Sequence, residues 1–480
     1  SLSRKPLLRR LYPPAVYSNI PIMTFEVIVL AAGKGTRMQS REPKVMQDLA
    51  GRSLFSHVMT TAAGLQPSHI HVVHGHDDGV LQRAVQQLSG VNWVCQDQQL
   101  GTAHAVLQAL PAVNPESDVL VLYGDVPLIK QPTLASLVAA VAGRNLVVLT
   151  AHVPEPGGYG RVVRGRDGSV ARIVEERDAN EDEKAICEIN TGFIAAPATV
   201  LSRLLERIGN ENDQGEYYLT DAVGHAVESG TPVLTHTTTD IDEVSGVNTA
   251  QQLARLERAY QARQAEELMR AGLCLRDPIR FDLRGTMEFG TDCMIDVNVL
   301  LVGHVVLGNN VTIGTNCTVV DSELGDGVSV KPNSVIEGAR VGSDCSIGPF
   351  ARLRSGTVLA KGARVGNFVE LKETRMGEGS KANHLAYVGD AEIGRNVNIG
   401  AGVITCNYDG ANKHKTLIGD DAFIGSDSQL VAPVEVGPGA TVGAGSTLTG
   451  NAPAGKLTLS RSKQVTRDNW QRPQKKDQVK

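Results

Sequence analysis

Residues 341–371 read VGSDCSIGPFARLRSGTVLAKGARVGNFVEL, and an aliphatic residue recurs in them at every sixth position. The recurring residues are Val341, Ile347, Leu353, Leu359, Val365 and Leu371. A second run with the same spacing comprises Ile418, Ile424, Leu430, Val436, Val442 and Leu448. Glycine often follows the aliphatic residue, and 28 of the 50 glycines fall between Gly285 and Gly455. A fixed period of this kind predicts a repeat architecture.

The six-residue period favours a parallel β-helix over antiparallel hairpins. Hairpins would need turns at regular places, with alternation of apolar and polar residues between them. In a parallel β-helix each coil has three short faces, and each face turns one aliphatic residue inward. Neighbouring coils then stack these residues into one continuous core, while glycine supplies the corner conformations. We therefore predict a β-helix over residues 273–458.

The period breaks at residues 373–387 and 406–416, and interruptions of a solenoid often form functional loops. Polar side chains gather in or near these segments: Glu370, Lys372, His384, Tyr387, Asn398, Asn407, Tyr408 and Lys413. His384 suits a general base because an imidazole titrates near neutral pH. A solvated or core histidine is the alternative, and the pattern alone leaves both open.

The other half of the chain alternates short apolar runs with helical patterns. Residues 25–32, FEVIVLAA, are typical of a buried parallel strand and lead directly into GKGTRM at residues 33–38. The further expected elements are strands at 69–74, 119–123 and 146–151 and helices at 54–64 and 102–110. This order predicts a doubly wound α/β sheet that binds its ligand at the carboxyl ends of the strands.

Two features at those carboxyl ends point to phosphate chemistry. Gly33 and Gly35 let backbone N–H groups approach phosphate oxygens, and Arg37 and Lys44 add cationic donors. A plain strand-to-helix turn is the alternative for the glycines. The string is neither a Walker A loop nor a dinucleotide-binding GxGxxG, which disfavours an ATPase or a dehydrogenase. Asp125 is either an Mg²⁺ ligand beside phosphates or a helix N-cap.

The flanking segments are of three kinds. Residues 249–272 contain 23 positions without Gly or Pro before Gly272, which predicts a linker helix spanning roughly 34 Å. Residues 1–22 are basic and precede Met23. They lack the apolar region of a secretory signal, so we expect a flexible, non-native leader, with an organelle transit peptide as the alternative. Residues 459–480 form a polar, basic arm with Trp470 as its large apolar side chain.

The composition of the chain limits the kinds of partner that we expect it to bind. The net charge of -5 and the 4% aromatic content give no footprint for nucleic-acid binding, and the apolar runs are shorter than a membrane span. Seven cysteines without CxxC spacing fit a reducing compartment, and we expect a cytoplasmic protein. Neither nucleic acid nor a membrane is an expected partner.

Several segments carry a resemblance to a known family. Five segments within residues 23–248 resemble the sugar-nucleotide pyrophosphorylases: LAAGKGTRM, QDQQLGTAHA, LYGDVPL, EINTG and QGEYYLTD. More narrowly, they resemble the uridyltransferase half of the bifunctional bacterial N-acetylglucosamine-1-phosphate uridyltransferase / glucosamine-1-phosphate acetyltransferase. Five later segments resemble the acetyltransferase half of the same enzyme: FARLRSG, GNFVELK, SKANHLAYVGD, NIGAG and CNYDGANKHKT. The resemblance implies a nucleotidyltransferase-like first domain, a left-handed β-helix and a homotrimer whose active sites are shared between solenoids.

The resemblance also implies a first site that binds UTP and the UDP-sugar. Its residues are Leu30, Ala31, Ala32, Gly33, Lys44, Gln96, Gly101, Thr102, Tyr123, Gly124, Asp125, Gly160, Glu175, Asn190 and Asn248. Gln96, Gly101 and Thr102 would read the uracil, and Asp125 and Asn248 would hold Mg²⁺. Arg37 and Lys44 would be catalytic, stabilising charge on the phosphates. By itself, the acidic cluster around Glu175 is typical of a solvated face.

The second implied site has His384 as its general base. Glucosamine-1-phosphate would contact Arg354, Lys372, Tyr387 and Asn398. Acetyl-CoA, the co-substrate, would contact Ala401, Asn407, Tyr408, Ser426, Ala444 and Arg461. We add that Glu370 could orient His384 by hydrogen bonding. Asn383 stands where the family pattern has glycine, which puts the pose of His384 in doubt, and Cys406 borders the expected acetyl-CoA loop as a buried residue or a reactive thiol.

The implied activity is synthesis of UDP-N-acetylglucosamine in two steps. Acetyl transfer to glucosamine-1-phosphate comes first. The product's phosphate oxygen then attacks the α-phosphorus of UTP and releases pyrophosphate, which requires positioning and charge neutralisation rather than a protein nucleophile. The alternatives are a non-catalytic scaffold subunit and a monofunctional glucose-1-phosphate nucleotidyltransferase. The presence of Lys44, Asp125, Asn248 and His384 disfavours the scaffold, and the acetyltransferase motifs disfavour the monofunctional enzyme.

Overall fold

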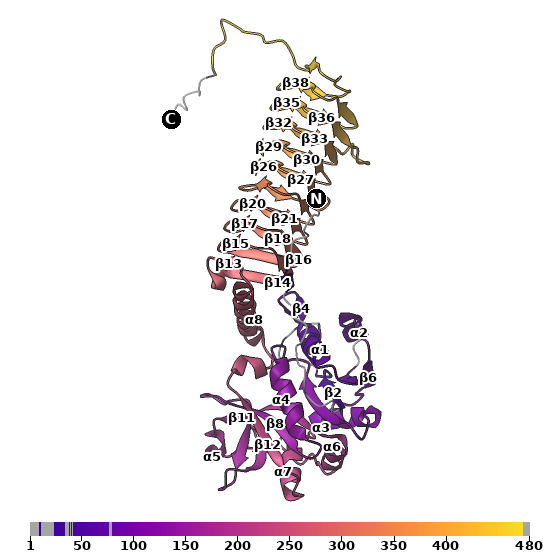
Figure 1. Ribbon diagram of the computed structural model, residues 1–480, viewed down its shortest axis with the longest axis vertical. Coiled ribbons are helices and arrows are strands. Elements are labelled where there is room, and N and C mark those ends of the chain that lie inside the picture. The colour runs from indigo at the N-terminus through magenta and orange to yellow at the C-terminus, as the bar shows by residue number, and fades with distance from the viewer. Residues whose placement is uncertain are drawn as a thin grey trace, which may run out of the picture. The chain divides into compact units, whose positions relative to one another are not determined.

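The computed structural model describes residues 9–10, 24–33, 38, 40, 42–75 and 79–473. The chain forms two compact units, residues 12–266 and residues 267–480 together with 1–11 (Figure 1). Helix α8 (Ala250–Arg270) crosses the boundary between them, where the run of helix formers predicted it. The Thr249 hydroxyl accepts a hydrogen bond from the Gln252 backbone N–H at 3.2 Å, and Gly272 follows the helix with a φ of 105°. Both ends therefore carry the capping residues expected of a helix.

The first unit is built on a mixed sheet. Four strands run parallel in the spatial order β6 (Val91–Cys95), β5 (Ile70–His74), β2 (Phe25–Leu30) and β7 (Asp118–Tyr123). Because the order changes direction at β2, the loop after β2 lies at the topological switch point, where open α/β sheets bind ligands. This part of the sheet is the doubly wound arrangement predicted from the sequence.

Beyond β7 the sheet becomes partly antiparallel. The long strand β11 (Glu188–Pro197) pairs antiparallel with β7, β8 and β9. The remaining strands of this unit are β3 (Asp48–Leu49), β4 (Arg52–Ser53), β8 (Leu146–His152), β9 (Gly160–Arg164), β10 (Val170–Val174) and β12 (Val233–Thr238). The alternation of strands and helices gave no signal for β9 to β11, because these strands follow each other without a crossover helix of ordinary length.

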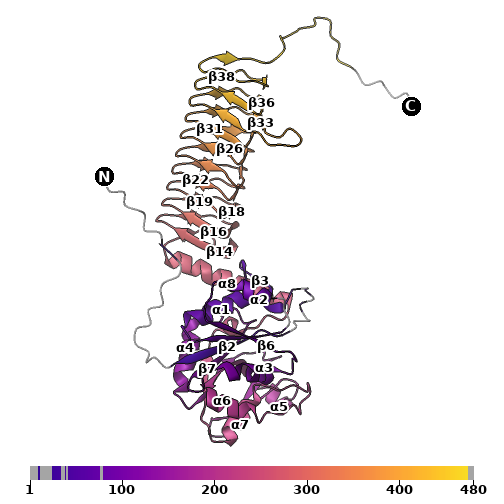
Figure 2. The same ribbon diagram turned by 90° about the vertical axis from the view of Figure 1, so that its right-hand side faces the viewer.

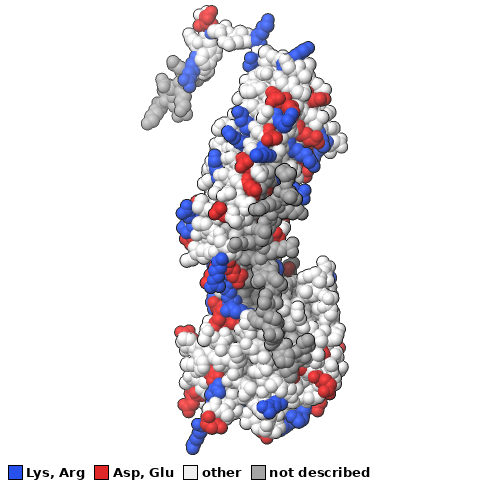
Figure 3. Space-filling view, in the orientation of Figure 1, with Lys and Arg blue, Asp and Glu red and all other residues white. Residues whose placement is uncertain are grey.

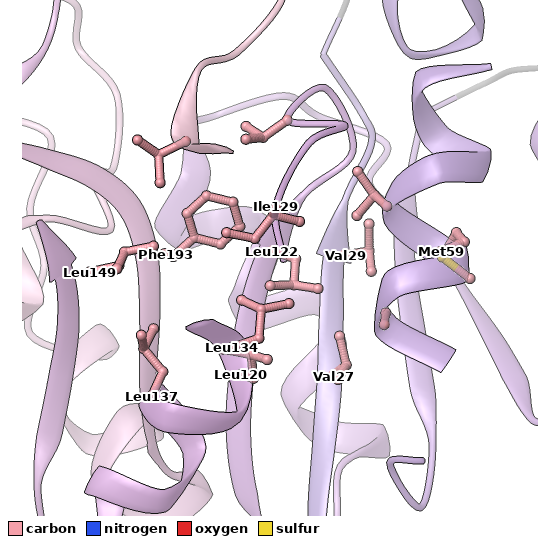
Figure 4. Close-up of a cluster of buried hydrophobic side chains, with 14 of the residues drawn as sticks. Val27, Val29, Met59, Leu120, Leu122, Ile129, Leu134, Leu137, Leu149 and Phe193 are labelled. Carbon is pink, nitrogen blue, oxygen red and sulfur yellow. The ribbon is translucent and has the colours of Figure 1, made fainter. Parts of the chain in front are cut away.

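Helices cover both faces of the sheet. On one face α1 (Leu54–Gly64) and α4 (Gln131–Val141) pack against Val27, Leu120 and Leu122, and Met59 and Leu137 belong to the same buried cluster (Figure 4). On the other face lie α3 (Thr102–Ala109), α6 (Ala198–Leu205) and α7 (Asp221–Glu228). The shorter helices are α2 (Val80–Ala84), α5 (Glu181–Lys184), η2 (Lys44–Met46), η3 (Leu110–Ala112) and η4 (Ile241–Val244). Two buried layers thus hold the carboxyl ends of the strands in fixed positions.

The second unit is a left-handed parallel β-helix whose strands stack in three rows (Figures 1 and 2). Row 1 contains β13 (Cys274–Leu275), β15 (Met294–Ile295), β17 (Thr312–Ile313), β20 (Ser329–Val330), β23 (Ser346–Ile347), β26 (Arg364–Asn367), β29 (Lys381–His384), β32 (Asn398–Ile399), β35 (Phe423–Ile424), β38 (Thr441–Val442) and β40 (Leu457–Thr458). The one short helix of its first coil is η5 (Pro278–Arg280).

The other two rows begin on the long strands β14 (Phe281–Phe289) and β16 (Val299–Leu307). Row 2 continues with β18 (Thr318–Val320), β21 (Val335–Glu337), β24 (Arg352–Leu353), β27 (Glu370–Lys372), β30 (Tyr387–Gly389), β33 (Ile404–Cys406), β36 (Gln429–Val431) and β39 (Thr447–Leu448). Row 3 continues with β19 (Glu323–Leu324), β22 (Arg340–Val341), β25 (Val358–Leu359), β28 (Arg375–Met376), β31 (Ala391–Ile393), β34 (Thr416–Ile418) and β37 (Val434–Val436).

The core of the solenoid is the aliphatic repeat that the sequence displays. Val365 and Leu371 are at most 1% exposed, and each such side chain contributes about 1.5–3 kcal/mol by burial. Paired residues of neighbouring coils lie 17 or 18 positions apart, as Ser329 does from Ser346 and Ser346 from Arg364. One coil therefore equals three hexapeptides.

The two expected interruptions differ. The first, at residues 373–387, is no interruption, because Met376, Ala382 and Val388 continue the buried column in coils of ordinary length. A five-residue step from Leu371 to Met376, followed by a small alanine, hid the period. The second is real: Ala391 pairs with Thr416, 25 residues later, so this coil carries about eight extra residues. They form a hairpin at residues 407–415 that projects from the side of the solenoid beside β33 (Figure 2).

The two ends of the chain contain little regular secondary structure among the described residues. Strand β1 (Arg9–Arg10) pairs antiparallel with Glu288 and Phe289 of β14, and the rest of the expected leader lies outside the described residues. After β40, residues 459–473 are mostly exposed, including Trp470 at 65%. Positive and negative side chains are interspersed over the face of the solenoid seen in Figure 3. No helix among the described residues is long and apolar enough to cross a bilayer.

Candidate functional sites

The centre of the first site is a three-residue polar cluster at the carboxyl ends of β2 and β7. The Lys44 ammonium at the start of η2 forms an ion pair with the Asp125 carboxylate, and its Nζ lies 3.0 Å from the Asn248 Oδ1. The backbone also joins the segments that carry Asp125 and Asn248, since the Val247 N–H donates to the Asp125 carbonyl at 3.0 Å. Three segments distant in sequence therefore meet at one point.

The cluster also fits a divalent cation. Asp125 and Asn248 present hard oxygen ligands to the lysine ammonium, a positive charge that stands in for a cation between them. Mg²⁺ usually takes one or two protein oxygens together with phosphate and water oxygens. Among the described residues no group of three or more His, Cys, Asp or Glu could hold a metal by itself. A metal at Asp125 and Asn248 would thus depend on oxygens of a bound phosphate or of water.

Next to this cluster lies the strand end that was expected to contact phosphates. Leu30, Ala31, Ala32 and Gly33 follow one another at the end of β2, and the Gly124 N–H donates to the Leu30 carbonyl at 2.9 Å. A side chain at Gly124 would begin 3.3 Å from that carbonyl oxygen, so the two strand ends approach closely. Arg37, the other expected catalytic cation, lies outside the described residues.

Tyr123 lies between this cluster and the expected sugar residues. Burial, with the nearby Glu175 and Asp125 carboxylates, raises the pKa of Tyr123 well above its ordinary value, so it stays a neutral phenol. Its ring packs edge-on against Phe193 with centroids 6.1 Å apart. Gly192 has a φ of 89°, and a Cβ there would lie 2.7 Å from the Tyr123 ring. Sequence reasoning did not single out Gly192, although the segment EINTG contains it.

The expected sugar residues come together on β9, β10 and β11. Asn190 on β11 pairs with Gly160 on β9, and its Oδ1 accepts from the Gly192 N–H at 3.1 Å. A Cβ at Gly160 would lie 3.4 Å from both carboxylate oxygens of Glu175. These contacts bring Asn190, Gly160 and Glu175 together near Tyr123.

Glu175 is not part of a solvated face. Burial raises its pKa, a hydrogen bond that Thr220 donates at 2.9 Å opposes the shift, and the nearby Asp221 and Asp178 add to it. Its neighbour Glu176 instead forms an ion pair at 2.6 Å with Arg161, which is buried at 1% exposure. The sequence analysis did not identify Thr220 as a site residue, although it lies in the segment QGEYYLTD. The interpretation of the acidic cluster as a solvated face was therefore wrong for Glu175.

The three expected uracil contacts surround the start of α3. Gly101 has a φ of 117°, and a Cβ there would lie 2.5 Å from the Tyr217 carbonyl oxygen, so no other residue fits without movement. The Gln96 amide, 4% exposed, donates to the Gly101 carbonyl at 3.3 Å. The Thr102 hydroxyl accepts from the Leu219 N–H at 3.0 Å, a contact that ties α3 to the following segment.

The second site surrounds row 2 of the solenoid, with His384 at one edge. His384 pairs in register with Asn367 one coil earlier, and its Nδ1 lies 2.8 Å from the Asn367 Oδ1. Gly366 allows this approach, because a Cβ there would lie 1.9 Å from the Asn383 carbonyl oxygen. An amide oxygen only accepts hydrogen bonds, so Nδ1 is the donor of this contact, and in the neutral imidazole Nε2 carries the lone pair.

This geometry bears on two predictions made from the sequence: that Glu370 orients His384, and that Asn383 alters its pose. Glu370 does not orient it, because the Glu370 carboxylate accepts from the Arg354 guanidinium at 2.9 Å. Asn367 takes that position instead. Asn383 lies in strand β29 and is not among the residues with a positive φ, so its backbone has no need of glycine. The neighbouring Leu385, with a φ of 48°, makes the corner instead.

Polar residues cover the outer surface of row 2. Tyr387 pairs in register with Glu370, and Lys372 pairs with Gly389. The Lys372 Nζ lies 3.4 Å from Asp390, whose carboxylate also accepts from the Asn407 amide. Lys413 neighbours Lys372: the positive charge of Lys372 lowers the pKa of Lys413, whereas the Asp390 carboxylate favours the charged form of Lys372 and raises its pKa. Two adjacent lysine side chains therefore lie beside the Asp390 carboxylate on this surface.

A column of small residues leads from His384 along one corner of the solenoid. The Leu385 carbonyl accepts from Gly402, the Ala401 carbonyl from Asp427 and the Ser426 carbonyl from Gly445. The Ala444 carbonyl accepts from the Arg461 guanidinium at 2.7 Å. At about 4.8 Å per coil, the column from His384 to Ala444 extends about 14 Å, a path suited to an elongated ligand.

The other expected residues of this site lie away from that column. Asn398 on β32 pairs with Lys381, and Tyr408 is 61% exposed in the hairpin, where its hydroxyl donates to the Gly410 carbonyl. Cys406 is half-buried, and all seven cysteines are free thiols. Within this chain, the structure therefore places the expected acetyl-CoA residues on two corners of the solenoid.

A mixed-sheet α/β unit with a polar Lys–Asp–Asn cluster at its switch point, followed by a hexapeptide β-helix, defines a two-domain transferase. Residues 27–214 match the MobA-like NTP transferase domain, residues 283–376 the GMPPB C-terminal domain, and residues 415–450 the bacterial transferase hexapeptide (six repeats). The bifunctional protein GlmU of Alkalilimnicola ehrlichii is 54% identical over 447 residues, which cover 93% of this chain and 96% of that protein.

The chain belongs to the family of the bifunctional protein GlmU. It is an enzyme with a uridyltransferase domain of the NTP transferase type and an acetyltransferase domain of the hexapeptide type. The resemblance seen in the sequence segments is thereby confirmed, and the scaffold and monofunctional alternatives are set aside.

Proposed function

We propose that the two sites act in sequence on one sugar: residues 273–458 acetylate glucosamine-1-phosphate, and residues 23–248 uridylylate the product to UDP-N-acetylglucosamine. In the first step the sugar amine attacks the acetyl carbonyl carbon of acetyl-CoA. His384 Nε2 takes the amine proton, and the coenzyme leaves as its thiol. The observation that carries this half is the Asn367 contact, which keeps Nε2 free to accept a proton.

Phosphate recognition supports the choice of substrate for this step. Lys372, Lys413 and Arg354 supply positive charge on or beside row 2, and Tyr387 and Asn398 would contact the sugar. Acetyl-CoA would follow the corner through Ala401, Ser426, Ala444 and Arg461, with Asn407 and Tyr408 closing the opposite side. We further propose a homotrimer, which would bring the two corners of neighbouring solenoids together around one substrate. This arrangement would explain why the expected acetyl-CoA residues lie on two corners of a single chain.

In the second step an oxygen of the sugar phosphate attacks the α-phosphorus of UTP, and pyrophosphate leaves. The observation that carries this half is the Lys44 ammonium held between Asp125 and Asn248. Asp125 and Asn248 would hold Mg²⁺, which supplies charge neutralisation on the phosphates when bound. Lys44 and Arg37 would then supply positive charge to the triphosphate. Glu175, Asn190 and Gly160 would hold the N-acetylated sugar, and Leu30 to Gly33 with Gly124 the phosphates.

Product analysis tests both halves together. The reaction mixture contains the protein, glucosamine-1-phosphate, acetyl-CoA, UTP and Mg²⁺, and mass spectrometry follows both products. We expect UDP-N-acetylglucosamine, and we expect EDTA to abolish it while N-acetylglucosamine-1-phosphate still forms. Absence of the acetylated sugar would refute the acetyl-transfer assignment, and a uridylyl product that survives EDTA would refute the metal assignment.

The substrates suggest where the enzyme works. UTP and acetyl-CoA are cytoplasmic metabolites, and the seven free thiols suit a reducing compartment. We propose a cytoplasmic enzyme whose product supplies precursors of bacterial cell-wall polymers.

A further inference from the structure

The Gln96 side chain has both of its amide hydrogens occupied. Its Nε2 donates to the Gly101 carbonyl at 3.3 Å and lies 2.9 Å from the His104 Nδ1. A backbone carbonyl only accepts, so the nitrogen and not the oxygen of the amide faces Gly101. Among the described residues the structure records no donor to the amide oxygen. The oxygen is therefore the polar atom that Gln96 offers to a ligand.

His104 secures this orientation from the first turn of α3. Because its Nδ1 accepts from Gln96, its own proton lies on Nε2. The Gln108 Nε2 lies 3.3 Å from that ring nitrogen. The backbone is fixed as well, since the Ala103 N–H donates to the Tyr217 carbonyl at 2.9 Å. The two contacts of the Gln96 nitrogen, with the Gly101 carbonyl and with His104 Nδ1, thus turn the Gln96 oxygen away from both partners.

We propose that His104 determines which pyrimidine nucleotide the uridyltransferase site accepts, by holding Gln96 as a hydrogen-bond acceptor. The inference rests on the proposed uridyltransferase function and on the family resemblance, which implies that Gln96 and Gly101 contact the uracil. Uracil carries an N–H at N3 and satisfies the oxygen. Cytosine carries a lone pair at N3, so the same oxygen would face a second acceptor in a largely buried place. His104 is a positioning residue, because it acts through Gln96 and does not touch the substrate.

The size of the discrimination follows from the unpaired acceptor. A buried polar group left without its partner costs enough to lower transition-state binding by about 10- to 100-fold. We therefore expect kcat/KM for UTP to exceed that for CTP by at least this factor. Most of the difference is expected in KM, since the contact lies away from the reacting phosphorus.

The experiment measures kcat/KM with UTP and with CTP for the full-length enzyme and three variants of His104. His104→Lys places an obligate donor beside Gln96, turns the amide around and lowers the UTP/CTP ratio at least tenfold. His104→Phe removes the acceptor and lowers the ratio less. His104→Gln offers an amide oxygen as acceptor and retains most of the ratio. The matched control is His225→Lys on α7, a helix that carries none of the nucleobase residues.

Acetyl transfer and thermal unfolding serve as folding controls for every variant. Gln96→Ala separates the two hypotheses, because it removes the base contact itself. If Gln96→Ala lowers the ratio and His104→Lys leaves it at the wild-type value, the role of His104 is refuted and the site assignment stands. If Gln96→Ala also leaves the ratio unchanged, the nucleobase assignment fails, and the inference fails with it.

Discussion

The contact between Asn367 and His384 supports a quantitative prediction about acetyl transfer. Replacing Asn367 with Ala removes the 2.8 Å acceptor from Nδ1 and leaves the imidazole free to rotate and change tautomer. One hydrogen bond of this kind contributes about 1 kcal/mol, which corresponds to roughly a fivefold loss in kcat. His384→Ala removes the base itself and is expected to cost about 10²- to 10⁴-fold.

The double variant decides whether Asn367 acts through His384. If it does, Asn367→Ala has no further effect in the His384→Ala background, because the two residues work as one unit. The assay follows free coenzyme A thiol release at saturating glucosamine-1-phosphate, and uridylyl transfer by the same preparations is the control for folding. Asn383→Gly is the matched neighbouring change and is expected to stay within about twofold of wild type, because its backbone φ needs no glycine.

Two results would refute this reasoning. An equal loss from Asn367→Ala with and without His384 would show that Asn367 serves the fold or the substrate directly. A larger loss from Asn383→Gly than from Asn367→Ala would show that the corner at Asn383 positions the histidine.

Three further predictions concern the first unit. Asp125→Ala is expected to lower uridylyl transfer about 10²- to 10³-fold with acetyl transfer unchanged, measured by release of pyrophosphate; equal losses in both activities would contradict it. Gly101→Ala forces a Cβ to 2.5 Å from the Tyr217 carbonyl and is expected to lower the stability of this unit by about 1–3 kcal/mol in chemical unfolding, whereas an unchanged midpoint would contradict the close approach. Burial and the Arg52 charge lower the pKa of His57 from 6.5 to about 4. The neutral His57 therefore contributes its full stabilisation above pH 6.5, and about 3 kcal/mol of the free energy of unfolding is lost as the pH falls to 4. His57→Gln should make the free energy of unfolding less dependent on pH across that window.

The solenoid was the part of the fold that the sequence predicted best. The one wrong prediction about it, the interruption at residues 373–387, has a clear physical reason. Aliphatic residues every six positions define the coils because each face needs one inward side chain. Residues 373–387 seemed to interrupt them because Leu371 to Met376 is a five-residue step and Ala382 fills its place with a small side chain. The interruption at residues 406–416 was located correctly, since about eight extra residues displace the period completely.

The sites show where sequence reasoning stops. Lys44, Asp125 and Asn248 meet although more than 200 residues separate the first from the last, and no local pattern predicts that contact. The family resemblance supplied it. Asn367, in contrast, could have been found: one coil is 17 residues long here, and 367 plus 17 is 384. Glu370 lies closer to His384 in sequence, but it belongs to row 2 and pairs with Arg354.

The antiparallel strands β9 to β11 illustrate a third case. They carry Gly160 and Asn190, yet the alternating pattern gave only the parallel strands, because the antiparallel strands succeed one another over short connections. The burial of Glu175 depends on this arrangement, since Thr220 and Tyr123 approach it from outside the local sequence. A charge cluster in sequence cannot distinguish such a pocket from a solvated face.

Separation of the two activities by single substitutions tests the central claim most directly. The measurement is mass spectrometry of products from wild type, His384→Ala and Asp125→Ala, each given glucosamine-1-phosphate, acetyl-CoA, UTP and Mg²⁺, and in parallel N-acetylglucosamine-1-phosphate with UTP and Mg²⁺. We predict that His384→Ala makes UDP-N-acetylglucosamine only from the acetylated sugar, and that Asp125→Ala stops at N-acetylglucosamine-1-phosphate. Loss of both activities in either folded variant would contradict the assignment of the two reactions to two separate sites.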